Sequence, residues 1–161
     1  MADEQTELLK KILAQLEKAD AFGSLPLRGD WRWRPFDFAD VPLAVNELKV
    51  LIDMERPGWI VWGVVTLNNP GVTGIVEIET KTDKYRNSFT TTDLYAMGLT
   101  NPQPNSWWNS VYNIPASLYA VQFTPAMWWP FYKRFKFSLE NKTATAANLT
   151  RAVILCIEML K

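Results

Sequence analysis

The sequence predicts a mainly β protein, an antiparallel β-sandwich preceded by an N-terminal α-helix. Three observations lead to this prediction. From residue 47 onward, segments with a period of two recur between short turn signals, which is typical of antiparallel strands. No strand–helix–strand unit occurs, which disfavours a parallel α/β fold. Eight Trp, eight Phe and five Tyr in 161 residues supply bulk for a core between two sheets.

Three segments follow one another along the chain. The apolar pattern of residues 1–22 predicts a helix. Leu9, Ile12 and Leu16 recur at helical spacing, and a glycine that can end the helix follows at position 23. Residues 23–46 are interpreted as an irregular linker, in which Trp31 and Trp33 share one face of any extended stretch. Residues 47–161 are predicted to form the sandwich domain.

Six strands are expected within that domain. Their order is 48–54, 59–67, 72–80, 118–124, 131–140 and 151–160. The second and the last are apolar on both faces, and for the second this predicts a central position in its sheet. Residues 85–117 are the least regular stretch, with one helical turn expected at 92–97 and ended by Gly98.

Composition excludes several classes of function. Seventeen basic and seventeen acidic residues give zero net charge, so no nucleic-acid partner is expected. The chain has no His and one Cys, and it lacks phosphate-binding glycine motifs, so no metal and no cofactor are expected. The acidic start and the short apolar runs predict neither a secretory signal nor a membrane span. Synthesis in a reducing cytoplasm is therefore expected.

No catalytic residues are predicted. Without His, nothing activates a Ser or Cys nucleophile, and Cys156 is interpreted as a small buried hydrophobic residue. The pairs Asp53/Glu55 and Glu77/Glu79 leave a glycosidase as a third hypothesis. A solvated strand face is the preferred interpretation of these carboxylates.

Two adjacent tryptophan pairs carry an alternative function. Trp107, Trp108, Trp128 and Trp129 lie near prolines, and in an extended chain the two rings of each pair point to opposite sides. Exposed tryptophans stack on sugars, so these four residues are the candidate ligand platform of a carbohydrate-binding module.

The second half of the chain has a recognisable cadence. It runs through the segments 91–99 (TTDLYAMGL), 117–125 (SLYAVQFTP) and 129–141 (WPFYKRFKFSLEN), followed by a closing apolar strand. Over residues 48–160 this resembles small single-jelly-roll virion proteins of tailed phages and archaeal viruses. In that family a Pro-Phe entry, a strand ending in Asn, a polar turn and a closing strand complete the sandwich.

The resemblance implies a jelly roll and a structural role, and it transfers no functional residue. The expected function is that of a non-enzymatic virion component, either a capsid decoration, a vertex or a tail-associated protein. Its partners would be itself, as a trimer or another homo-oligomer, and other virion proteins, and its location would be the virion. Leu9, Ile12 and Leu16 are the predicted helix contacts, and Trp31 and Trp33 are predicted to anchor the linker.

Overall fold

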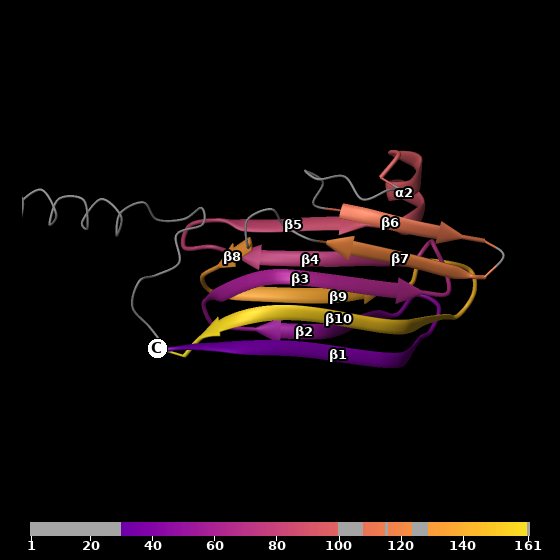
Figure 1. Cartoon of the computed structure of the whole chain (residues 1–161). Helices are drawn as coiled ribbons and strands as arrows, with labels where there is room; N and C mark the ends of the chain where they lie inside the picture. The colour runs from indigo at the N-terminus through magenta and orange to yellow at the C-terminus, as the bar shows by residue number, and fades with distance from the viewer. Residues whose placement is uncertain (1–29, 100–107, 115, 124–128, 161) are drawn as a thin grey trace, which may run out of the picture.

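A computed structural model of the chain describes residues 30–99, 108–114, 116–123 and 129–160, with the side chains of 108–113 and 123 excepted. The helix predicted over residues 1–22 lies outside this range. The described chain is mainly β, as predicted, and its strands form two antiparallel sheets packed as a sandwich (Figure 1).

Sheet A is built from β1 (Trp31–Leu43), β3 (Gly58–Leu67), β6 (Trp108–Asn113), β7 (Leu118–Phe123), β8 (Trp129–Phe131) and β10 (Ala147–Met159). Its order is β1-β10-β3-β7-β6, and β8 pairs with the start of β3. Sheet B is built from β2 (Leu48–Met54), β4 (Thr73–Glu79), β5 (Lys84–Phe89) and β9 (Arg134–Glu140), in the order β2-β9-β4-β5.

The predicted strands reappear with shifted ends. The two segments that are apolar on both faces, β3 and β10, are flanked on both sides within sheet A; this confirms the central position predicted for 59–67, and 151–160 is central as well. The segment 131–140 divides into β8 and β9, because the chain crosses from one sheet to the other there. The predicted helical turn is α2 (Thr91–Ala96), with Thr90 as its N-cap and Gly98 at a positive φ of 77° after its end.

The linker interpretation is wrong for residues 31–43, which form β1. This strand pairs with β10 along its whole length, from Trp31 opposite Met159 to Leu43 opposite Ala147. Two features hid it. Its prolines are tolerated because it pairs on one side only within the described sheet. At Asp40, with a φ of 52°, the inward-facing positions change parity, so no regular alternation runs through the segment.

The stretch from 85 to 117 is also more regular than predicted, because it contains most of β5 and all of β6. Five of the six residues of β5 are exposed, and the strand lies at the edge of sheet B. A strand with so few buried positions leaves little hydrophobic period in its sequence.

The core lies between the sheets. Sheet B contributes Phe135, Phe137 and Leu139 from β9, which are the inward positions that the alternation of 131–140 predicted. Sheet A contributes Ala152, Ile154 and Cys156 from β10, all fully buried. The interpretation of Cys156 as a buried apolar residue is confirmed, and burial raises the pKa of its thiol to about 12.

The buried side chain of Asn141 connects the end of β1 to the turn that precedes β10. The side chain of Asn141 donates to the carbonyls of Leu43 and Thr145, at 3.1 and 3.0 Å, and its Oδ1 accepts from the amide and hydroxyl of Thr143. The residue is fully buried. Its amide thus donates to the carbonyl of Leu43, which is buried, and to that of Thr145 in the following turn, which makes Asn141 a structural residue of the fold.

We expect Asn141→Ala to lower the free energy of unfolding by about 2–3 kcal/mol, because it removes a donor from the buried carbonyl of Leu43 and the acceptor of the Thr143 amide and hydroxyl. Asn87→Ala, on the exposed edge strand β5, is the control and should cost less than about 0.5 kcal/mol. Urea denaturation monitored by tryptophan fluorescence measures both values. Equal losses in the two variants would contradict the structural role of Asn141.

We expect the Cys156 thiol to be inert in the folded protein. A pKa raised from 9.0 to about 12 lowers the thiolate fraction at pH 8 by roughly a thousandfold, because each pKa unit is a factor of ten. Ellman's reagent should therefore react only after urea is added. Rapid reaction in native buffer would show that this strand is open to solvent.

Candidate functional site

The two faces of β10 are both apolar, and only one of them belongs to the core. Ala152, Ile154 and Cys156 point inward, so the alternate positions of the strand, from Val153 to Met159, point away from sheet B. Residues directly opposite in neighbouring strands share a face, so the register extends this outer surface over β1 and β3.

Cross-strand rows make up this outer surface. Its first rows contain Trp31 with Met159, then Trp33, Ile157 and Trp59, then Pro35, Leu155 and Trp62. The next row contains Val153 and Val64 with Asp37 at the β1 end. We call the ten apolar residues of these rows the apolar face of sheet A: Trp31, Trp33, Pro35, Trp59, Trp62, Val64, Val153, Leu155, Ile157 and Met159.

Tryptophans dominate one end of the apolar face. The rings of Trp31 and Trp59 lie 4.5 Å apart between centroids, so they meet across the strand that separates β1 from β3. Trp33 leaves 56% of its surface exposed, whereas its row partner Ile157 is buried. In Figure 1 the ribbons of β10 and β3 pass in front of sheet B, and no described element lies over them.

The opposite end of the same face is polar. Arg151 lies in the row of Ala39 and Thr66, and its guanidinium donates to both carboxylate oxygens of Asp37, at 3.2 and 2.9 Å. This bond with Arg151 holds the pKa of Asp37 below its usual value. The apolar face therefore has two unlike ends. Tryptophans lie at the end formed by the start of β1, and the Arg151–Asp37 ion pair lies at the other end, beside the middle of β1.

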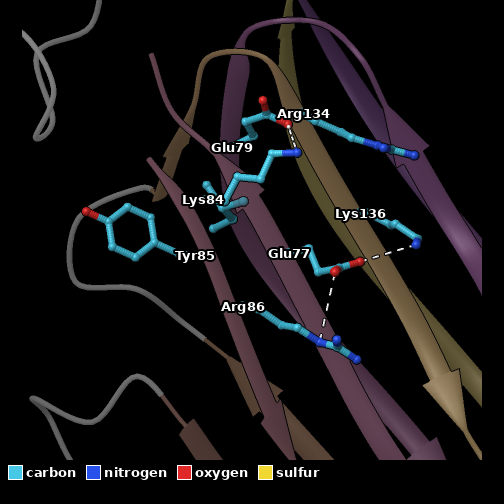
Figure 2. A pocket seen from close by; sticks show the side chains of 8 residues that line it. Glu77, Glu79, Lys84, Tyr85, Arg86, Arg134 and Lys136 are labelled. Carbon is cyan, nitrogen blue, oxygen red and sulfur yellow. Dashed lines mark ion pairs between the residues drawn. The ribbon is translucent and has the colours of Figure 1, made fainter. Parts of the chain in front are cut away.

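The outer face of sheet B has the opposite character. Glu77 pairs with Arg86 on one side and with Lys136 on the other, and Glu79 pairs with Lys84 (Figure 2). Arg134 donates from Nε and Nη2 to the two carboxylate oxygens of Asp53, at 2.6 and 2.5 Å. Charges of opposite sign thus alternate from strand to strand, and they line a groove beside Tyr85.

These ion pairs decide how the carboxylates of sheet B are interpreted. Glu77 and Glu79 are each held by cations on an outer strand face, which confirms the preferred interpretation of this pair. The hydrogen bond from Arg134 lowers the pKa of Asp53, whereas a glycosidase acid needs a raised one. Two carboxylates and four cations line the groove, and each of the two carboxylates is paired with a cation.

One charged side chain lies beneath the tryptophan end, on the inner side of sheet A. Glu158 accepts a hydrogen bond from Arg32 at 2.8 Å and lies 3.6 Å from Arg56. The side chain of Glu158 is 9% exposed, whereas those of Arg32 and Arg56 are 50% and 57% exposed. The bond with Arg32, helped by the nearby positive charges, lowers the pKa of Glu158.

The structure places two of the five predicted contact residues. Trp31 and Trp33 both lie on the apolar face of sheet A, and Leu9, Ile12 and Leu16 lie outside the described residues. Trp59, Trp62 and Leu155 were not singled out from the sequence as residues of this outer face, on which Trp59 is itself buried. The signal was present, since both strands are apolar on both of their faces.

Of the four tryptophans of the predicted sugar platform, the structure describes the side chain of Trp129 alone. Trp129 lies opposite Ile60 in β8 and packs, partly buried, against the core. Trp107 and Trp128 lie outside the described residues, and Trp108 is described only as a backbone position in β6. The platform therefore stays a prediction, without support from Trp129.

The described ranges contain neither a metal-binding cluster nor a membrane-spanning helix. No group of three or more Cys, Asp or Glu in these ranges is arranged to hold a metal ion. The helices described there are too short or too polar to cross a membrane. No protein-family model matches the chain, and no curated protein does.

We expect Glu158→Gln to destabilise the protein at pH 7 by about 1 kcal/mol, because solvent screens its half-exposed arginine partners. A lowered pKa means that this contribution is present above pH 4.5 and is lost as the pH falls through the folded-state value. The unfolding temperature of the variant should therefore differ from that of the parent at pH 7 and converge with it as the pH falls below the folded-state pKa of Glu158.

The control for this measurement is Asp37→Asn, which breaks a pair whose carboxylate side chain is 55% exposed. A smaller change at pH 7 is expected there. Equal changes in the two variants at pH 7, or a difference that does not shrink as the pH is lowered from 4.5, would contradict the assignment of Glu158.

Proposed function

We propose that the protein is a non-enzymatic structural component of a virus particle, which acts by binding copies of itself and neighbouring virion proteins. The observation that carries the assembly role is the contrast between the two outer surfaces. Sheet B is covered with paired charges, whereas sheet A presents tryptophans and aliphatic residues in consecutive rows. Monomeric proteins rarely expose apolar surface of this kind unless it binds something.

The strand order supports the finer proposal that the sandwich is a jelly roll. With β6 and β7 counted as one hairpin and β8 set aside, the described part of the chain has eight strands. Sheet A then has the order 1-8-3-6 and sheet B the order 2-7-4-5. Two four-stranded sheets with strands exchanged in this way form the paired Greek keys of a jelly roll.

The viral setting rests on the resemblance of residues 48–160 to small virion proteins. A place as capsid decoration, vertex or tail-associated protein, synthesis in the host cytoplasm and a trimeric or other homo-oligomeric state belong to the same proposal. The physical mechanism is burial of the apolar face of sheet A against a neighbour. Tryptophans are among the residues that contribute most to such interfaces. Among the tryptophans of this face, Trp33 is the one with a large exposed surface.

We expect Trp33→Asp to weaken self-association at least about tenfold, because it places a charge within the buried contact. Tyr85→Asp is a matched control, since Tyr85 is 50% exposed on the edge strand of sheet B. Sedimentation equilibrium over a range of concentrations measures both variants, and circular dichroism checks that each one folds. If both variants associate as the parent does, the apolar face is not the assembly contact.

A further inference from the structure

The described chain starts at Asp30, beside the tryptophan end of the apolar face of sheet A. The amide of Leu160 donates to the carbonyl of Asp30 at 2.9 Å, and Trp31 lies opposite Met159. Residues 1–29 therefore leave the fold beside the tryptophan end of the face. Any segment attached at this point is held within reach of the surface.

The sequence of that segment matches the face in chemistry. Residues 3–22 carry the stripe of Leu9, Ile12 and Leu16 at helical spacing, widened by Leu8 and Leu13. A helix of this length is marginal in water and gains stability when its apolar side is buried. An uncovered sheet surface rich in tryptophan is in turn prone to unspecific association.

Lengths also agree. A helix over residues 3–22 is about 30 Å long at 1.5 Å per residue. The outer surface of β10 from Met159 to Arg151 extends about 26 Å at 3.3 Å per residue. The seven residues 23–29 reach about 23 Å when extended, which is enough to turn the helix back over the sheet.

Charge favours one direction. A helix that folds back from the tryptophan end carries its start, with Asp3 and Glu4, to the opposite end of the face. Arg151 stands at that end with an exposed side chain. Acidic residues at a helix start next to an arginine are favourable both for the helix dipole and for the pair.

We propose that residues 3–22 of the same chain form a helix that covers the apolar face of sheet A in the free protein. This inference rests on the proposed function, because the helix and a neighbouring copy compete for the same surface. Tethering gives the segment an effective concentration in the millimolar range, so at micromolar protein it outcompetes the same segment of another copy. Assembly then requires that the helix be displaced.

Disulfide trapping tests the placement in the full chain. Ile12→Cys is paired with Val153→Cys, and Leu16→Cys with Leu155→Cys, so that a small shift of the helix along the sheet still gives one reactive pair. Lys11→Cys with Val153→Cys is the control, because Lys11 lies on the opposite side of the predicted helix. Cys156 stays in place because it is buried.

On mild oxidation, at least one of the two pairs should form an intramolecular disulfide about tenfold faster than the control, at a rate that does not change on tenfold dilution. Two results overturn the inference. One is that neither pair reacts faster than the control. The other is that the disulfides link two chains.

Association measurements separate this inference from the proposed function. The variant Leu9→Gln, Ile12→Gln, Leu16→Gln uncovers the face and should associate about tenfold more tightly than the parent. Adding Trp33→Asp should abolish that gain. Lys11→Gln, Ala14→Gln and Lys18→Gln together change the other side of the predicted helix and should leave association unchanged.

The outcomes differ for the two ideas. If the stripe variant gains nothing while Trp33→Asp still weakens association, the covering helix is wrong and the assembly face stands. If the stripe variant associates less tightly, the segment is itself a contact between copies, and the inference is overturned. If Trp33→Asp changes association in neither background, the proposed function fails, and the disulfide rates alone decide whether the helix covers the face.

Discussion

The fold and its candidate site both depend on one strand that is apolar on both faces. β10 lies between β1 and β3, and its thirteen residues hold the longest pairings of sheet A. Its inward residues close the core, and its outward residues form the middle of the apolar face. Because the period of a strand is two, a shift of the register by one residue would exchange these two sets. Core packing and surface chemistry are therefore fixed by the same hydrogen-bond ladder.

The two outer surfaces of the sandwich divide the work of solubility and contact. On sheet B each carboxylate of the central rows faces a cation in the next strand, so the surface is hydrated and electrically balanced. On sheet A the rows from Trp31 to Val64 offer water almost nothing to bind. This asymmetry supports the proposal that the protein binds its partners through one side of the sandwich.

The sequence predicted elements well where burial leaves a periodic signal. The alternation of 131–140 placed Phe135, Phe137 and Leu139 in the core, and the doubly apolar run 59–67 predicted a central strand. The prediction failed for β1, an edge strand that tolerates prolines, and for β5, an edge strand with five exposed residues. Neither of these strands carries a clear hydrophobic period. The site was found only in part: Trp31 and Trp33 were singled out, whereas Trp59, Trp62 and Leu155 were not.

By itself, the sequence determined that this chain builds a β-sandwich rich in aromatic residues and carries no histidine-based chemistry. Periodicity and composition are local properties, and they suffice for such statements. Only the tertiary structure decided which apolar residues seal the core and which face outward. A strand that is apolar on both sides contains no information about the side on which the second sheet packs. That choice depends on the pairing of β10 with β1 and with β3, in which each residue of β10 lies more than eighty positions from its partner in the chain.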